Sequence, residues 1–287
     1  MSIQDGKYWS ESWNPVKTAD GHYHCTKCSP GCLNCWAEGI NIRAGGGPYA
    51  ERSVPQKSQR DFEDSVPEIL RISRGVPASG DDRPVVYVFD EKTIKNKKLD
   101  GLEPKTFFVC DLCDLFHKDV PDSIIERVFE EIEKYQRHRF LLLTKRPERI
   151  SNDERRTTND ENLFLGVSVC VESEKWKIDA LRQVSAAHRW VSFGPLLEAM
   201  DRIDLAGIDW VVMEAESLGG RPGRECSWAW MLSIIGQAKD QGVPVWVKQI
   251  NYRNRLIRDL DQMPSELCVR ELPEELQTTS IENGLSQ

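Results

Sequence analysis

The sequence predicts an α/β protein whose fold is a partial (open) β/α barrel of the TIM type, built from parallel strands. Two observations predict this class. Between residues 106 and 247, continuous apolar runs alternate with helical segments, a pattern typical of parallel strands that are buried on both faces. About seven such strand–helix units follow one another in one run, which favours one barrel over two doubly wound domains. We therefore expect a barrel domain over residues 1–258 and an acidic, partly ordered C-terminal extension over residues 259–287.

The expected elements follow from local patterns. The first strand ends at Asn14-Pro15, and the helix after the first cysteines stops at a run of three glycines and a proline, residues 45–48. The helix over residues 121–135 has Pro121 near its first turn and an apolar stripe on one face. A basic run, residues 92–98, is expected to be exposed to solvent. Strands are expected over residues 7–13, 85–89, 106–109, 139–143, 163–169, 190–193, 210–213 and 243–247, and helices over residues 36–43, 121–135, 172–183 and 227–239.

Composition restricts the class of protein. The chain has 287 residues, of which 39% are hydrophobic, and a net charge of −8. It can bury a large core, and its charge argues against a general polyanion binder but allows a local basic groove. The sequence has neither a signal-like start nor an apolar run long enough to span a membrane, so we expect a soluble, unexported protein. The odd number of cysteines, nine, favours a reducing compartment in which clustered thiols are ligands.

Four of the nine cysteines, Cys25, Cys28, Cys32 and Cys35, lie within eleven consecutive residues. Thiolates this close together are typical of an iron–sulfur or soft-metal site. Cys28-x3-Cys32-x2-Cys35 has the spacing with which radical S-adenosylmethionine enzymes hold a [4Fe–4S] cluster and leave one iron open. Cys25-x6-Cys32-x2-Cys35 offers a second set of three ligands. A structural zinc site is another interpretation, although the two cysteine pairs of a zinc ribbon are usually separated by about 15–20 residues, whereas three residues separate Cys28 from Cys32. A disulfide is the third interpretation.

Polar residues stand where almost every expected strand ends. In a β/α barrel, catalytic groups lie at the carboxyl ends of the strands, so we expect these exits to form one site. The exit residues are Cys110, Asp111, Cys113, Asp114, His117, Thr144, Lys145, Arg146, Ser168, Cys170, Gly194, Pro195, Glu214, Glu216, Ser217, Lys248 and Gln249.

A basic patch lies beside the last exit. It consists of Lys248, Arg253, Arg255 and Arg258, with Tyr252 between them. The patch is interpreted either as a contact for a nucleic acid, through phosphate binding and aromatic stacking, or as a basic helix face that balances the acidic C-terminal extension.

Several blocks resemble the phage-type three-cysteine-motif proteins, which are relatives of radical S-adenosylmethionine enzymes and are similar to spore photoproduct lyase. The blocks, which run in order through most of the chain, are residues 11–15, the cysteines with Ser29-Pro30-Gly31 and Trp36-Ala37-Glu38, Asp111 with residues 114–117, and residues 143–147, 165–169, 195–197, 216–217 and 247–249. In that family the ligands match Cys25, Cys32 and Cys35, so Cys25 is preferred over Cys28 as the first ligand. Gly194 stands where the family usually has Glu, and Cys170 where it usually has an acidic residue.

The resemblance implies a radical enzyme with a [4Fe–4S] cluster and S-adenosyl-L-methionine as cofactors. An external one-electron reductant would drive cleavage of S-adenosyl-L-methionine to a 5′-deoxyadenosyl radical. The substrate is expected to be a nucleobase, a nucleotide or DNA, bound through the basic patch, in the cytoplasm of a bacterium or a phage-infected host cell. The alternative is a non-catalytic nucleic-acid-binding or redox-sensing protein, stabilised by zinc or a cluster, that works with a partner.

The site residues have expected roles in binding the cofactor and in catalysis. Asp111 and Asp114 would bind the methionine ammonium group, and a cation among Lys145, Arg146 and Lys248 would bind its carboxylate or a substrate phosphate. The residues expected to bind the cofactor are Asp111, Asp114, Thr144, Ser168, Glu216, Ser217 and Lys248, and those expected to act in catalysis are Cys170 and Lys145.

Overall fold

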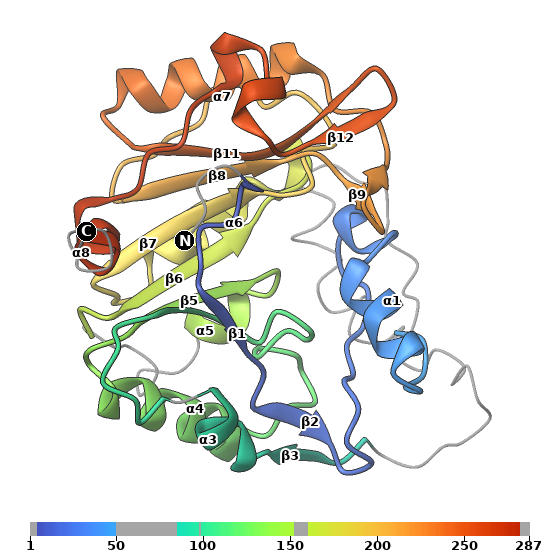
Figure 1. The fold of residues 1–287 in the computed structure, drawn as a ribbon, viewed down its shortest axis with the longest axis vertical. Coiled ribbons are helices and arrows are strands. Elements are labelled where there is room, and N and C mark those ends of the chain that lie inside the picture. Colours follow the sequence, from blue (N-terminus) through green and yellow to red (C-terminus); the bar gives the residue numbers. More distant parts are fainter. Residues whose placement is uncertain (1–4, 50–84, 98, 152–159, 282–287) are drawn as a thin grey trace.

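An eight-stranded sheet forms the centre of the molecule, in the strand order β1-β4-β5-β6-β7-β8-β11-β12 (Figure 1). The structure is a computed structural model that describes residues 5–49, 85–97, 99–151 and 160–281. All neighbouring pairs from β1 to β11 are parallel, and only β12 runs antiparallel. The end strands β1 and β12 do not pair with each other, so the described chain forms an open, partial β/α barrel, as predicted.

The elements have the following bounds. The strands of this sheet are β1 (Glu11–Trp13), β4 (Thr106–Val109), β5 (Arg139–Thr144), β6 (Leu163–Ser168), β7 (His188–Phe193), β8 (Trp210–Glu214), β11 (Val245–Tyr252) and β12 (Arg255–Ile257). Two small antiparallel hairpins are β2 (Val16–Thr18) with β3 (Tyr87–Phe89), and β9 (Ser217–Leu218) with β10 (Arg221–Pro222). The α-helices are α1 (Trp36–Arg43), α3 (Lys92–Lys97), α4 (Asp122–Lys134), α5 (Glu148–Ser151), α6 (Trp176–Arg182), α7 (Trp228–Asp240) and α8 (Glu274–Ile281). Short 3-10 turns are η2 (Pro30–Cys32), η4 (Glu172–Glu174), η5 (Leu260–Gln262) and η6 (Ser265–Leu267).

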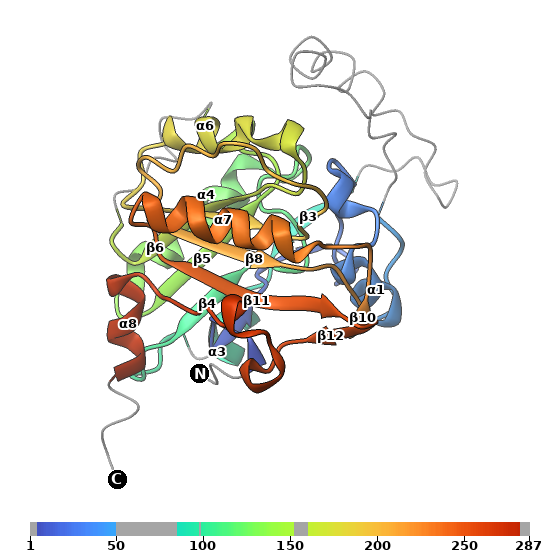
Figure 2. The same cartoon turned by 90° about the horizontal axis from the view of Figure 1, so that it is seen from above.

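Helices α4, α6 and α7 cover one face of the sheet, and Figure 2 shows them on the same side. Their apolar stripes, for example Ile125 and Val128 of α4 and Ile234 of α7, pack against alternate strand residues in one large core. Burial of such a stripe explains why the apolar periodicity of residues 121–135 predicted a helix there. None of the described helices has the length and apolar character that crossing a membrane requires.

The opposite face of the sheet changes character along the strands. Towards the amino ends it carries an aromatic layer, which we define as Tyr8, Phe108, Phe164, Trp190, Trp210 and Trp246. Towards the carboxyl ends the same face carries a polar layer, which we define as Ser168, Ser192, Glu214 and Lys248. Side chains two residues apart on a strand share a face, so β6 passes from Phe164 through Gly166 to Ser168. Aromatic rings therefore fill the barrel at the amino ends of its strands, and polar side chains line its carboxyl ends, which we call the mouth.

Glycine at position 166 is needed for close packing in the aromatic layer. A Cβ at Gly166 would lie 2.5 Å from the indole ring of Trp190, too close for any other residue without a shift of that ring. The Trp190 Nε1 donates to the Phe164 carbonyl at 3.1 Å, which holds the ring across β6. The polar layer thus lies directly next to aromatic side chains whose positions are fixed.

The structure corrects three details of the sequence interpretation. Residues 7–10 were expected to be part of the first strand, but β1 begins only at Glu11, and Tyr8 instead lies across the aromatic layer. The helix expected over residues 172–183 is divided into η4 and α6. The helical interpretation of the basic patch is wrong, because residues 245–257 form the β11–β12 hairpin, with Arg253 and Asn254 in left-handed backbone conformations at its turn.

Residues beyond 258 were expected to form a partly ordered extension. The described part contains η5, η6 and α8. Leu267 and Leu276 are buried in the two core clusters, and Arg270 forms a bridge with Trp246 of β11. The division of the chain at residue 258 stays a prediction.

Candidate functional site

The cysteine loop, which we define as residues 25–35, lies across the carboxyl end of the sheet beside α1 (Figure 1). Gly31 sits directly on the buried Cys170, and any side chain at Gly31 would overlap the Cys170 sulfur and approach the Pro195 ring to 3.2 Å. Ser29 is buried, accepts a hydrogen bond from the Gly31 amide at 3.2 Å, and hydrogen-bonds to Glu174. The middle of the loop is therefore seated on the exits of β6 and β7.

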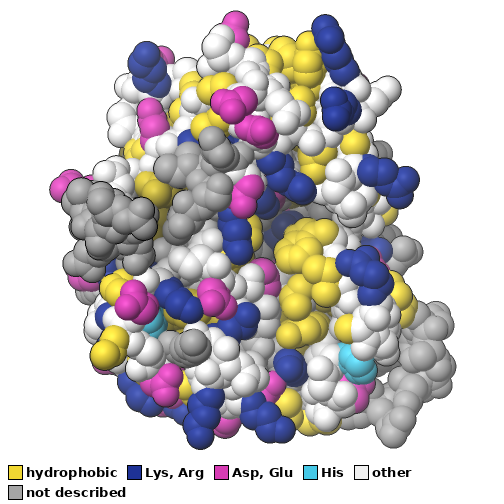
Figure 3. Space-filling model, in the orientation of Figure 1, with side chains coloured by type: hydrophobic (Ala, Val, Ile, Leu, Met, Phe, Trp, Pro, Cys, Tyr) yellow, Lys and Arg dark blue, Asp and Glu magenta, His cyan; other side chains and the backbone are white. Residues whose placement is uncertain are grey.

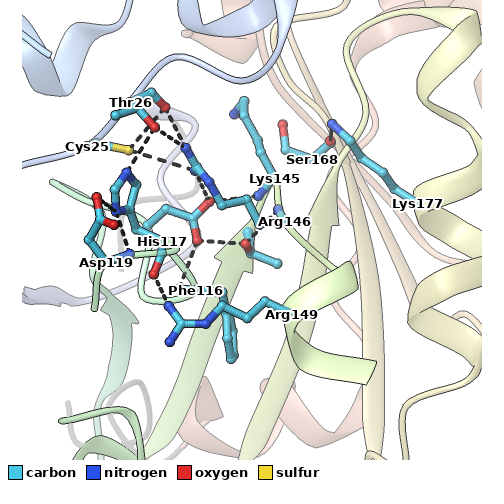
Figure 4. A network of polar contacts seen from close by, with 12 residues as sticks. Cys25, Thr26, Phe116, His117, Asp119, Lys145, Arg146, Arg149, Ser168 and Lys177 are labelled. Carbon is cyan, nitrogen blue, oxygen red and sulfur yellow. Dashed lines mark hydrogen bonds and ion pairs between the residues drawn. The ribbon is translucent and has the colours of Figure 1, made fainter. Parts of the chain in front are cut away.

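Arg146 fixes the first part of the cysteine loop. Its guanidinium donates to the Thr26 carbonyl at 2.6 Å and to the Thr26 Oγ1 at 3.0 Å, and it approaches the Cys25 sulfur at 3.9 Å (Figure 4). The same group pairs with Asp114 at 2.9 Å. Arg146 is buried, so its bonds to the loop are protected from competition with water.

Glu216 fixes the last part of the loop. Its carboxylate accepts from the Asn34 amide at 3.0 Å and from the Arg224 backbone and guanidinium at 2.5–3.0 Å. Burial acts to raise the pKa of Glu216, but the hydrogen bonds from Arg224 and Asn34 outweigh it and lower this pKa. Glu216 is therefore held as a carboxylate that ties the loop to the β9–β10 hairpin.

Thiol electrostatics differ along the loop. A hydrogen bond with Cys28 lowers the pKa of Cys32 to about 5, and the same bond raises the pKa of Cys28. Burial raises the pKa of Cys25 to about 12, although Arg146 acts in the opposite direction. Burial raises the pKa of Cys35 as well. The loop thus carries its most stable thiolate at Cys32, between Cys28 and Cys35.

The Lys145 ammonium lies beside these thiols. The Lys145 Nζ makes no hydrogen bond or ion pair with any residue that the structure describes, and in Figure 4 its side chain points away from that of Arg146. Burial acts to lower the pKa of Lys145, but the charges of Cys170 and of Cys32 outweigh it and raise this pKa. Lys145 therefore stays protonated and supplies a positive charge beside the cysteine loop.

A second cation lies below the loop. Lys177 of α6 is buried and pairs with Glu174 at 2.7 Å, and the other oxygen of Glu174 accepts from the Cys170 amide at 2.8 Å. Because Glu174 also bonds Ser29, this ion pair supports the loop from the side of β6. Burial acts to raise the pKa of Glu174, but Lys177 outweighs it and lowers this pKa.

The donor set of the loop fits an iron–sulfur cluster better than a single zinc ion. All nine cysteines of the chain are free thiols in the structure, and the four of the loop are half-buried. Within the described residues, three potential ligand atoms come within 4.8 Å of one another only at His24, His117 and Asp119. Zinc requires its four ligands at about 2.0–2.3 Å from one centre, whereas the thiolates of a four-iron cluster each bind a different iron and stand further apart.

The predicted cofactor-binding residues lie at the strand exits, and several of them already make other contacts. Asp114 accepts from Thr144 Oγ1, from two backbone amides and from Arg146. Asp111 accepts from Ser12 Oγ and Asn14 Nδ2. Both carboxylates thus orient the exits of β4 and β5, and their contact with a methionine ammonium stays a prediction.

The remaining predicted site residues lie at the other exits. Ser168 Oγ donates to the Gly194 carbonyl at 3.0 Å. Cys170 is fully buried, and its sulfur contacts Ser168 Oγ and the Gly194 carbonyl. Ser217 Oγ accepts from the Gly220 amide in the β9–β10 hairpin. Lys248 pairs with Glu214 at 2.5 Å and lies over the Trp9 ring. Their catalytic and cofactor roles stay predictions.

The predicted basic patch is divided between two places. Lys248 belongs to the polar layer, whereas Arg253, Arg255 and Arg258 are exposed on or next to the β11–β12 hairpin. Arg258 also donates to Gln249 at 2.9 Å. Figure 3 shows hydrophobic side chains gathered beside α1, next to a hollow with Lys and Arg side chains around it. Among the exposed hydrophobic residues of the molecule are Leu33, Trp36 and Leu218, from the cysteine loop, α1 and β9.

Sequence reasoning missed the residues that hold the loop in place. Thr26, Asn34, Ser29, Glu174 and Lys177 contact the exits only after the chain has folded. Lys177 lies in a helical segment where a lysine is usually exposed, so no local signal distinguished it. Thr26, Ser29 and Asn34 lie between the cysteines in the sequence, and this placement was the only indication that they help to hold the loop.

Residues 5–267 match the family described as "Protein of unknown function (DUF5131)". The chain is also 30% identical over 107 residues to "Protein Tat" of Human immunodeficiency virus type 1 group N (isolate YBF106), a match that covers 37% of this chain and 90% of Tat. That stretch is shorter than the sheet, which extends from Glu11 to Ile257, so the likeness does not cover the site as a whole.

Two of the similar solved structures are of spore photoproduct lyase. A mutant with bound AdoMet and dinucleoside spore photoproduct has 12% identity and a TM-score of 0.40, with 96% of this chain and 74% of that chain covered. Spore photoproduct lyase complexed with dinucleoside spore photoproduct has 14% identity and a TM-score of 0.36, with 91% and 72% covered. With identities and TM-scores this low, we draw no conclusion from either likeness. The assignment of an open barrel depends on the strand order of this chain alone.

Proposed function

The chain belongs to the DUF5131 family, whose description names no reaction, and from the site we propose that it is a radical S-adenosylmethionine enzyme with a [4Fe–4S] cluster on its cysteine loop. One observation carries this proposal: four half-buried free thiols lie on a loop that is held at three points over the strand exits, beside Lys145, whose ammonium has no partner among the described residues. The resemblance of the sequence blocks to phage-type three-cysteine-motif proteins supports it.

Cys25, Cys32 and Cys35 would hold the cluster, with Cys28 as the neighbouring thiol that hydrogen-bonds Cys32. When bound, the cluster and S-adenosyl-L-methionine supply a one-electron reductive cleavage, driven by an external reductant, that gives methionine and a 5′-deoxyadenosyl radical able to abstract hydrogen from a substrate. The thiolate of Cys32, with its pKa lowered to about 5, is ready to bind iron at neutral pH.

The surrounding residues orient the loop and supply charge. Arg146 and Glu216 hold the two ends of the loop, and Gly31 seats its middle on Cys170. Of the two cations at the exit of β5, the Lys145 ammonium is available to a carboxylate or a phosphate, since Arg146 already binds Thr26 and Asp114. The aromatic layer closes the barrel below the polar layer and excludes water from that side, which a radical intermediate requires.

The proposed substrate is a nucleobase, within DNA or a nucleotide. Exposed aromatic and apolar side chains beside the loop, such as Trp36, are surfaces on which a base can stack. Arg253 and Arg255 on the β11–β12 hairpin are exposed cations that can bind phosphates. These stacking groups and cations would together bind the base and the phosphates of such a substrate.

The cofactor chemistry is tested by anaerobic reconstitution with iron and sulfide. We expect about four irons per chain and dithionite-dependent 5′-deoxyadenosine. Cys25→Ala and Cys28→Ala, prepared in parallel, determine the ligand set, because Cys25→Ala should lose the cluster whereas Cys28→Ala should retain it. A fully loaded cluster that yields no 5′-deoxyadenosine would contradict the proposed reaction.

The substrate class is tested by binding single-stranded DNA at several salt concentrations. Arg253→Gln and Arg255→Gln should each weaken binding and reduce the slope of log affinity against log salt by about one. Arg137→Gln is the matched control, because Arg137 is exposed but precedes β5 at the amino end of the sheet. Equal effects of all three substitutions would show that the hairpin is no specific nucleic-acid contact.

A further inference from the structure

Three side chains outside the cysteine loop bring possible metal ligands together. Ligand atoms of His24, His117 and Asp119 all lie within 4.8 Å of one another. His24 immediately precedes the cysteine loop, and the His117-x-Asp119 pair lies in the segment between β4 and α4. Two imidazoles and one carboxylate form a ligand set that suits divalent transition metals.

His117 is oriented as a metal-binding histidine would be. It is fully buried, and its Nε2 lies 2.9 Å from the Thr26 Oγ1, which is itself held by Arg146 at 3.0 Å (Figure 4). Its Nδ1 faces the Asp119 amide, which donates to it at 3.3 Å, and the Tyr87 hydroxyl at 3.2 Å. A donating Asp119 amide requires a lone pair on Nδ1, so the proton lies on Nε2 and points to Thr26. Metal-bound histidines commonly have their other N–H held in this way.

The two other ligands lie beside Nδ1. One Asp119 oxygen, Oδ2, lies 3.8 Å from the His117 Nδ1, while Oδ1 pairs with the neighbouring Lys118. The half-buried His24 ring has its centroid 5.5 Å from that of His117, with the ring planes at 86°. A cation placed between them would replace the long Asp119 amide bond and the Tyr87 contact at Nδ1.

We propose that His24, His117 and Asp119 bind one divalent transition-metal ion, for which zinc is the test metal, separately from the cysteine loop. The ion would connect the start of the cysteine loop to the segment between β4 and α4, next to the Thr26–Arg146 contact. It would therefore hold in place the part of the chain that presents Cys25. The proposal does not depend on the reaction proposed above.

The experiment separates this metal from any metal on the cysteines. Zinc is added to protein whose cluster has been loaded anaerobically and to a variant with all four loop cysteines replaced by alanine, and bound zinc and iron are measured by mass spectrometry. We expect one zinc per chain in both, with no loss of iron from the loaded protein. Cobalt(II) in place of zinc should give d–d bands without sulfur-to-cobalt charge transfer.

Variants identify the ligands. Asp119→Asn and His24→Gln should each weaken zinc binding by about tenfold or more, as loss of supporting groups alone costs about 10–100-fold. His22→Gln is the matched control, since His22 is two residues from His24 but outside the group, and its zinc affinity should not change. Circular dichroism verifies that each variant is folded.

Three results would overturn the proposal. The first is that the loaded protein takes up no zinc. The second is that Asp119→Asn, His24→Gln and the control His22→Gln take up zinc equally. The third is that zinc displaces iron from the loaded protein or does not bind to the variant without loop cysteines. Failure of 5′-deoxyadenosine formation with intact zinc binding would instead contradict only the proposed reaction.

Discussion

The aromatic layer and the polar layer lie on the same face of the same strands but are held together in different ways. In the aromatic layer the indole N–H groups of Trp190, Trp210 and Trp246 donate to the backbone carbonyls of Phe164, Glu271 and Gly6. In the polar layer Lys248 and Glu214 form an ion pair between side chains, and the Ser168 hydroxyl donates to the Gly194 carbonyl. The first arrangement ties the two ends of the chain to the barrel, whereas the second leaves charged groups at the mouth.

This difference separates stability from chemistry. Buried aromatic side chains contribute most of their free energy through area removed from water. The partly exposed Lys248–Glu214 pair adds little net stability but can exchange partners when a ligand arrives. Removing one partner of a buried charged contact costs more, because the other group is left without its partner. Substitutions in the aromatic layer should therefore destabilise the fold, and substitutions near the polar layer should change the cysteine site.

The largest effect is expected for Trp190→Ala. Loss of this fully buried side chain removes apolar contacts and leaves a cavity beside Gly166, so the free energy of unfolding should fall by about 3–5 kcal/mol. Urea denaturation measures this change. The protein that remains folded should still take up iron. Complete loss of iron uptake by folded protein would contradict the claim that the aromatic layer affects stability and not the cysteine site.

Gly166→Ala tests the same layer by overpacking. The new methyl group would lie 2.5 Å from the Trp190 ring, and the forced shift should cost about 1–3 kcal/mol of unfolding free energy. The double variant Gly166→Ala with Trp190→Phe, which has a smaller ring, should recover part of this loss. No recovery would mean that Trp190 is not what restricts position 166.

Glu216→Gln should weaken the fold by about 1–3 kcal/mol at neutral pH, because the buried contacts to Arg224 and Asn34 lose their charge. The folded-state pKa of Glu216 is lowered, so its stabilisation is present above the ordinary pKa of 4.5 and is lost as the pH falls through the lowered value. Urea titrations between pH 7 and 3 should show a shallower acid loss in the variant. Glu225→Gln, at the exposed neighbour of Arg224, should behave like the parent protein.

The smallest effect on stability is expected for Lys145→Gln, which should instead change the reduction potential of a bound cluster. Removal of a positive charge beside the thiols should make that potential more negative by on the order of tens of millivolts. Lys145→Arg retains the charge and should show a smaller shift. Redox titration followed by electron paramagnetic resonance gives the potential. Equal potentials in the parent protein, Lys145→Gln and Lys145→Arg would show that Lys145 does not act on the cluster.

Repeating local patterns made the fold predictable. Apolar runs separated by amphipathic segments are properties of neighbouring residues, so the strand at Leu163 and the helix at Asp122 were located within a few residues of their observed bounds. Errors arose where tertiary contacts decide. Tyr8 was predicted to be part of a strand but packs in the aromatic layer. A helix was one of two interpretations of the arginines after Tyr252, and these residues form a hairpin instead.

The sequence by itself determined the open barrel of parallel strands, the grouping of four cysteines on one loop, and the position of polar residues at the strand exits. Only the tertiary structure decided how the cysteine loop is held. Gly31 meets Cys170, Arg146 meets Thr26 and Glu216 meets Asn34 across separations of more than one hundred residues. Such contacts depend on which strand exits become neighbours in the sheet, and no local pattern of residues encodes that.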